Sequence, residues 1–359
     1  MKNKKVFWSL FLVVQIIALK ILSSFPEFIE RYYSNGIYPP ISKTLRILLG
    51  WIPFSFGDLA YSMAVLLILR WGWKTRKTWK KEYKSNLLTI TTCISVGYFF
   101  FYFLWAVNYH RVPLYQKLGI AKELNKKELL AFTEKLILKS NTLQNQITHN
   151  DSSRVISPYT QREIYKRTLN GYTAIALQHP YFQYDHLSIK NSLLSIPLTY
   201  MGFAGYLNPF TNEAQVNDMI PLYNYPTTAC HEMAHQIGYA SESEANFIGF
   251  LASVHNDDVY FQYSGYTFAL KYCLRLVERD DEALYESLMA KINYGIILNI
   301  CETEEFWDRY ENPSEVVFKV FYDNYLKMNQ QKDGLGGYAK FVGLMVNYYN
   351  SPQGWNDPF

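Results

Sequence analysis

Residues 228–238 decide the fold around them, and they read Thr228-Ala229-Cys230-His231-Glu232-Met233-Ala234-His235-Gln236-Ile237-Gly238. On a helix, His231 and His235 lie one turn apart on one face, so both imidazoles can reach a Zn²⁺ ion at about 2.0–2.1 Å. Glu232 follows the first histidine, and in this motif class it accepts a proton from water instead of binding the metal. Gly238 predicts the end of the helix, because glycine enters the left-handed conformation without a Cβ penalty. The stretch therefore predicts a helix that binds one zinc ion per chain.

A catalytic zinc site needs a third protein ligand, and two glutamates follow closely. Ser241 and Glu244 match the Ser-x-x-Glu pattern of a capping box, which predicts a second helix and gives Glu244 a structural role. This leaves Glu242 as the predicted third ligand, with Glu244 open as the alternative. Asn246 lies one turn beyond Glu242, where its side chain is expected to hydrogen-bond to the ligand.

These residues resemble known families. The order His231-Glu232-x-x-His235 and then Glu242-x-Glu244-Ala245-Asn246 resembles the gluzincins, in which a glutamate on the following helix is the third zinc ligand. Gluzincins place that glutamate much further downstream, so the choice between Glu242 and Glu244 stays open. The run Gly205-Tyr206-Leu207-Asn208-Pro209-Phe210-Thr211-Asn212-Glu213-Ala214-Gln215-Val216-Asn217, with Cys230-His231-Glu232, resembles a bacterial membrane-protein family of unknown function that carries a zinc-peptidase motif. This resemblance covers most of the chain and implies a zinc-dependent hydrolase fold without a known substrate.

Three apolar runs predict transmembrane helices at about 6–25, 54–71 and 87–107. The N-terminus is basic, and seven lysines and arginines lie within residues 70–86, from the end of the second run to the start of the third, so both segments are expected on the cytoplasmic side. Three crossings then place residues 108–359 outside the cytoplasmic membrane. We therefore predict a multi-pass protein of the cell membrane, with the lipid bilayer as one partner and with residues 1–107 as its membrane region.

Composition excludes some classes of protein. The 359 residues are 49% hydrophobic and 17% aromatic, and the net charge is only +4. A mild charge, with its basic residues gathered between apolar runs, indicates membrane topology and not nucleic-acid binding. The four cysteines have no metal-binding or disulfide spacing. The sequence does not determine the oligomeric state.

The part after 107 is predicted to be one zincin-like domain, mainly α with a small β element. Residues 126–147 have helical periodicity, and Thr160-x-x-Glu163 predicts a capping box. Residues 199–203 and 214–217 are expected to form short strands beside the zinc helix, where an edge strand binds an extended substrate or, alternatively, a loop packs on the helix.

We interpret the chain as a zinc metallopeptidase that cleaves a peptide or protein substrate, with Glu232 as general base. Phenol groups can stabilise an oxyanion, and Tyr263, Tyr266 and Tyr338 are the candidates, although each tyrosine in so tyrosine-rich a chain also suits simple packing. Two alternatives stay open. One is a membrane-anchored binding or sensor protein that keeps the zinc fold without turnover, and the other is an amidase acting on cell-envelope material.

Overall fold

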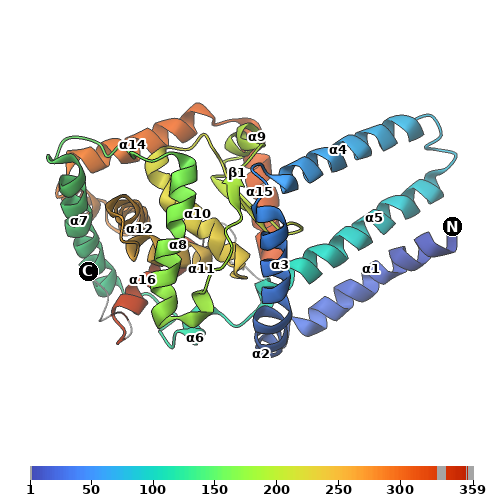
Figure 1. The fold of residues 1–359 in the computed structure, drawn as a ribbon, viewed down its shortest axis with the longest axis horizontal. Helices are drawn as coiled ribbons and strands as arrows, with labels where there is room; N and C mark the ends of the chain where they lie inside the picture. The colour runs from blue at the N-terminus through green and yellow to red at the C-terminus, as the bar shows by residue number, and fades with distance from the viewer. Residues whose placement is uncertain (1, 330–336, 353, 355–359) are drawn as a thin grey trace.

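Helices form most of the chain, and one small sheet lies among them, as the sequence predicts (Figure 1). The computed structural model describes residues 2–329, 337–352 and 354. The elements in chain order are α1 (Lys2–Leu22), α2 (Pro26–Phe28), the π-helix η1 (Ile29–Ile37), α3 (Tyr38–Gly50), α4 (Phe56–Thr75), α5 (Tyr83–Leu104), η2 (Ala106–His110), α6 (Leu114–Lys117), α7 (Lys126–Thr148), α8 (Gln161–Gln178), η3 (Pro180–Phe182), β1 (Ile189–Asn191), α9 (Ser195–Tyr200), β2 (Gly205–Asn208), β3 (Glu213–Val216), η4 (Leu222–Asn224), α10 (Tyr225–Gln236), α11 (Glu242–Val254), α12 (Val259–Asp280), α13 (Glu282–Met289), α14 (Tyr294–Arg309), α15 (Pro313–Met328) and α16 (Tyr338–Tyr349).

Helix α10, which carries the two histidines of the motif, lies in the centre of the helical domain. Ten of its side chains are buried, and α8, α11 and α12 pack around it. On α11, Phe247 and Phe250 are fully buried in the same core. Because the motif helix is enclosed by other helices, its polar side chains can be satisfied only by specific partners.

The sheet has the order β1-β3-β2, so β2 is an edge strand. The central strand β3 is parallel to β1 and antiparallel to β2, with Gly205 opposite Val216. The predicted strand 214–217 corresponds to β3, but the predicted strand 199–203 is wrong. Most of that segment belongs to helix α9 or the turn that ends it, because the Thr199 hydroxyl donates back to the Ser195 carbonyl and the chain turns at Gly202, whose φ is +78°.

Local signals for helix ends vary in accuracy. The Thr160 capping box is confirmed, since both of its reciprocal hydrogen bonds open α8. The predicted helix 126–147 is confirmed as α7. The Ser241 capping box is wrong, because the Ser241 side chain makes no cap bond and its hydroxyl contacts that of Ser243.

Helices α1, α4 and α5 project from one side of the domain (Figure 1). Two helices, Lys4–Leu22 and Tyr83–Leu104, are long and apolar enough to cross a membrane, and almost none of their residues is buried. The predicted span 54–71 forms α4, but Asp58 and Arg70 interrupt the apolar run near its two ends, and α4 does not pass the same test.

The segment between α1 and α4 packs on the domain that follows residue 107. The Tyr38 and Ser42 hydroxyls of this segment both donate to the Gln236 carbonyl at the end of α10, at 2.8 Å. Residues on both sides of the predicted boundary between 107 and 108 therefore share one interface.

Candidate metal centre

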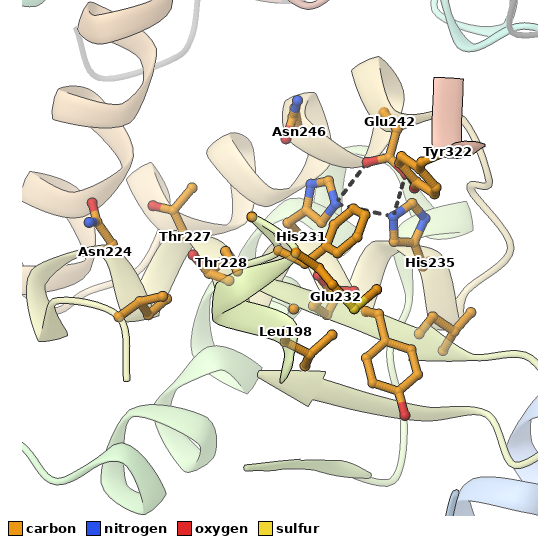
Figure 2. Close-up of a pocket in the computed structure, with 18 of the residues that line it drawn as sticks. Leu198, Asn224, Thr227, Thr228, His231, Glu232, His235, Glu242, Asn246 and Tyr322 are labelled. Carbon is orange, nitrogen blue, oxygen red and sulfur yellow. Dashed lines mark hydrogen bonds and ion pairs between the residues drawn. The ribbon is translucent and has the colours of Figure 1, made fainter. Parts of the chain in front are cut away.

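Two imidazoles face each other on α10. His231 and His235 are four residues apart, and their Nε2 atoms lie 3.1 Å from each other (Figure 2). His231, Glu232 and His235 form the one cluster of at least three potential metal ligands within the described part of the chain. The helical spacing alone produces this pair, as the sequence predicts.

Glu242 reaches the same point from the start of α11. Its Oε2 atom lies 3.4 Å from His231 Nε2, and its Oε1 atom lies 3.7 Å from His235 Nε2. The chain reverses between the two helices at Gly238, whose φ is +89°, which is a conformation that favours glycine. Ligands at about 2.0–2.1 Å from a tetrahedral zinc lie about 3.3–3.4 Å from one another. The three side chains therefore have the separations that such an ion requires.

A backbone carbonyl sets the orientation of His235. Its Nδ1 lies 2.7 Å from the Tyr239 carbonyl oxygen, and since a carbonyl only accepts, Nδ1 must carry the proton. When the ring is neutral, the Nε2 lone pair is then directed at His231 and Glu242. This is the arrangement typical of metal-binding histidines, whose second nitrogen donates to a carbonyl or carboxylate.

Glu232 is buried, and its carboxylate lies against the edge strand β2. The Oε2 atom has no hydrogen-bond partner among the described residues. A Cβ at Gly205 would lie 2.6 Å from Glu232 Oε1, so only glycine lets the strand approach the carboxylate this closely. Burial raises the pKa of Glu232 to about 7, against the opposing effect of the two histidines. A buried, unpaired carboxylate is costly unless a ligand or water completes it.

Tyr322 is a site residue that the sequence analysis missed. It lies on α15, and its hydroxyl donates to Glu242 Oε1 at 2.7 Å (Figure 2). A donor of this kind fixes the orientation of a ligating carboxylate. No local pattern could have found it, because 80 residues separate the two side chains.

The carboxylate of Glu242 and the histidines shift one another's protonation. Burial acts to raise the pKa of Glu242, but the two histidines outweigh it and hold that pKa well below its usual range. Burial lowers the pKa of His235, but Glu242 outweighs this effect and raises it to about 9. The three groups thus attract positive charge to one point, which a divalent cation would also satisfy.

Glu244 points away from the cluster. Its Oε1 accepts a hydrogen bond from the Leu114 backbone N–H at 2.6 Å, and its side chain is buried. This bond replaces the predicted capping bond. Among the described residues, the structure therefore brings Glu242, and not Glu244, to the two histidines.

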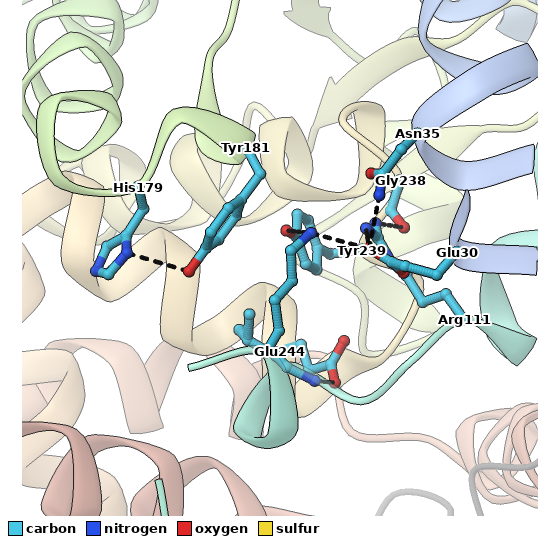
Figure 3. A network of polar contacts seen from close by, with 10 residues as sticks. Glu30, Asn35, Arg111, His179, Tyr181, Gly238, Tyr239 and Glu244 are labelled. Atoms are coloured by element: carbon cyan, nitrogen blue, oxygen red, sulfur yellow. Dashed lines mark hydrogen bonds and ion pairs between the residues drawn. The ribbon is translucent and has the colours of Figure 1, made fainter. Parts of the chain in front are cut away.

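A polar network supports the loop behind His235 (Figure 3). Arg111 donates to the Gly238 carbonyl at 2.9 Å and forms a two-bond ion pair with Glu30. Burial acts to raise the pKa of Glu30, but Arg111 and Lys117 outweigh it and lower that pKa to about 2. The network holds the segment that presents the Tyr239 carbonyl to His235.

The remaining predicted residues have other positions. Asn246 lines the same cavity as the cluster, but no hydrogen bond within the described structure joins it to Glu242. Tyr263 donates to Asn299 in the core, and Tyr266 packs on Phe250 there, so neither reaches the cluster. The side chain of Tyr338 lies outside the described residues.

A cavity of about 980 Å³ opens at the cluster. Its walls include His231, Glu232, His235 and Glu242, together with the strand residues Gly205, Tyr206 and Leu207. The cluster therefore faces a space large enough for a substrate, which is typical of a catalytic site and not of a closed structural one.

Fold and site together define a mainly helical protein with two helices that could cross a membrane and a His–Glu cluster at a large cavity. The chain belongs to the family described as "Protein of unknown function (DUF3810)", which matches residues 33–346. This confirms the predicted membership of a family of unknown function. No curated protein and no solved structure shows a significant match to the chain.

Proposed function

We propose that this chain is a membrane-anchored, zinc-dependent hydrolase that cleaves peptide bonds. One observation carries the proposal. The potential ligand atoms of three side chains lie 3.1–3.7 Å apart, beside a buried carboxylate of Glu232 that has no partner within the described structure. A purely structural site would have no use for a carboxylate placed in this way next to an open cavity.

The donor set suits zinc. His231, His235 and Glu242 would hold one ion per chain, and two imidazoles with one carboxylate are a known catalytic zinc set. When bound, zinc supplies a Lewis acid that polarises a carbonyl group and lowers the pKa of a water molecule. Tyr322 would keep the Glu242 carboxylate in place, and the Tyr239 carbonyl would keep His235 in the tautomer that binds metal.

Glu232 would move the proton. Its carboxylate lines the cavity beside the ligands, so it can take a proton from the attacking water and give it to the leaving amine. Gly205 keeps β2 against this carboxylate, and β2 is an edge strand that lines the cavity. An extended peptide could add to such an edge by main-chain hydrogen bonds, which favours a peptide as the substrate.

The arrangement of the N-terminal helices supports three crossings. Lys5 of α1 donates to Thr89 of α5, and Gln15 of α1 donates to Ser95 of α5, so the two helices run in the same direction. The segment between α1 and α4 packs on the domain, as Ser42 shows. If α1 and α5 both cross a bilayer toward the domain, α4 must cross it in the opposite direction.

Charge then favours one orientation. The basic N-terminus and the basic loop after α4 lie at the same end of this helix group, away from the domain (Figure 1). By the positive-inside rule, that end is cytoplasmic and the domain is extracytoplasmic. A reporter fused to the C-terminus should be active only outside the cytoplasm, and one inserted between Lys77 and Lys80 only inside. The reverse pattern would overturn this orientation.

The test of function combines metal content with turnover. The purified full-length protein should bind about one zinc per chain and cleave unstructured peptides, followed as new termini by mass spectrometry. Glu232→Gln should keep the zinc but lose cleavage, because an amide cannot accept the proton. Normal turnover by Glu232→Gln would refute the mechanism. Bound zinc without any cleavage by the wild type would favour a binding or sensor role.

A further inference from the structure

The cavity has two unlike ends, and they lie at opposite ends of helix α10. Trp105 immediately follows α5, and its indole N–H donates to the His235 carbonyl at 3.0 Å. At the other end of α10, the Thr227 and Ser264 hydroxyls lie 2.9 Å apart and join α10 to α12. Helices α4 and α5 lie on one side of the domain and α12 lies on the other (Figure 1). A substrate that fills the cavity therefore extends from the membrane helices, past the metal cluster, toward α12.

The first end is apolar and continuous with the helices that leave the domain. Tyr61 of α4 and Phe101 of α5 both line the cavity. Further from the domain, the two helices expose apolar side chains such as Leu66, at 60%, and Ile94, at 52%. Trp105, the residue that follows α5, hydrogen-bonds to α10, so the end of α5 lies beside the cluster. If α4 and α5 lie in a bilayer, the cavity therefore opens at the membrane surface.

Helix α15 extends this apolar surface across the cavity. On its inner side, the Tyr322 hydroxyl donates a hydrogen bond to Glu242, and the Tyr325 ring packs on Phe101 of α5 with ring centroids 6.2 Å apart. Its residues Val316 and Val317, which do not line the cavity, are 62% and 67% exposed. Exposed apolar side chains beside a membrane-spanning helix are typical of a surface that contacts lipid.

The second end is basic. Lys271 and Arg275 stand one turn apart on α12, both line the cavity, and neither forms an ion pair with a residue that the structure describes. Lys271 is half-buried, and burial together with the charge of Arg275 lowers its pKa, against the smaller opposing effect of Glu304. Arg275 is exposed, so the cavity wall holds one shielded and one solvated positive charge. Two like charges one turn apart repel each other, and an anionic group between them would relieve that repulsion.

We propose that the cavity binds a polypeptide attached to the membrane on one side of the bond to be cut and acidic on the other side. The inference rests on the proposed function, and it names the class of substrate. The apolar anchor of the polypeptide lies in the bilayer beside α4 and α5. The extended segment passes β2 and the metal cluster, and its acidic residues bind Lys271 and Arg275.

The experiment uses the full-length protein in liposomes and two synthetic polypeptides of identical composition. Each has one apolar helix of about 20 residues, which spans the bilayer. In the first polypeptide, a neutral segment adjoins the helix and a glutamate-rich segment lies at the far end, while the second has these two segments exchanged. Each polypeptide is made in two versions, with the helix at the N-terminus or at the C-terminus. Each carries a photoreactive group beside the helix, and crosslinking to Glu232→Gln measures binding without turnover.

The first order should crosslink about tenfold more than the second, since only it brings the acidic segment to α12. Lys271→Glu with Arg275→Glu should remove this preference, whereas Arg279→Glu, one turn further along the same helix, should leave it unchanged. Retained zinc and retained crosslinking of an all-neutral polypeptide would show that the double variant is folded. Equal crosslinking of both orders, or loss of the preference in Arg279→Glu, would overturn the proposal.

Cleavage by the wild-type protein is scored separately. Order-dependent binding without cleavage would refute the proposed hydrolase and leave the class of ligand standing. Cleavage of both orders at the same rate, with equal binding, would leave the hydrolase standing and refute the class of substrate.

Discussion

Replacing Glu242 by alanine removes one of three potential protein ligands from the cluster. Its oxygens lie 3.4 and 3.7 Å from the two Nε2 atoms, close to the ligand separation of a tetrahedral zinc. Four-ligand zinc sites bind with about 10–16 kcal/mol, so one ligand is worth about 3 kcal/mol. We therefore expect zinc affinity to fall by at least about a hundredfold in Glu242→Ala.

Glu244 provides the comparison, since it lies only two residues away and is also buried. Its carboxylate accepts the Leu114 N–H at 2.6 Å, and Glu244→Ala would leave that donor without a partner. The expected cost is about 1–3 kcal/mol of unfolding free energy, with little change in zinc affinity. Glu244→Gln keeps an acceptor oxygen and should be more stable than the alanine variant.

Zinc titration against one buffered chelator, with thermal unfolding of the same samples, measures both quantities. The predicted result is weak zinc binding in Glu242→Ala and weaker folding with nearly normal zinc binding in Glu244→Ala. Full zinc affinity in Glu242→Ala together with lost affinity in Glu244→Ala would show that the two glutamates have exchanged roles. It would also contradict the hydrogen bond between Glu244 and Leu114.

Three further outcomes follow from the geometry. Tyr322→Phe removes the donor to Glu242 and should weaken zinc binding about 10–100-fold in the same titration, and unchanged affinity would remove Tyr322 from the site. The Cβ of Gly205→Ala would lie 2.6 Å from Glu232 Oε1, so this variant should keep zinc yet lose most turnover of any identified substrate, and normal turnover would contradict the packing. Because the folded pKa of Glu30 is about 2 against an ordinary 4.5, its ion pairs contribute stability above about pH 5 that is lost as pH falls toward 2, about 3 kcal/mol in all. Glu30→Gln should be less stable at neutral pH and should lose less stability in that window, as thermal unfolding in detergent would show.

The centre of the candidate site could be predicted from sequence because its geometry is local. His231 and His235 share a face through helical spacing alone, and Gly238 ends the helix through its own conformational freedom. Glu242 was predicted for a wrong reason. The capping box that assigned Glu244 a structural role does not form, and the role of Glu244 comes instead from a bond to Leu114, 130 residues away.

Other parts of the site depend on contacts between distant segments. Tyr322 reaches Glu242 across 80 residues, and Trp105 reaches the His235 carbonyl across 130. Local periodicity holds no information about such pairs, because it records only which residues share a face of one element. For the same reason Tyr263 and Tyr266, which the sequence suggested, are not the tyrosines near the cluster, and the segment 199–203, expected as a strand, is the end of α9 and a turn.

By itself, the sequence determined that this chain has apolar N-terminal helices, a mainly helical domain and two histidines one turn apart. Each of these follows from composition or from spacing within one helix. Only the tertiary structure decided which glutamate meets the histidines, which tyrosine supports it, and that the cavity reaches from the apolar helices to Lys271 and Arg275. The physical reason is that burial and close approach arise when distant elements pack, and packing is a property of the whole chain.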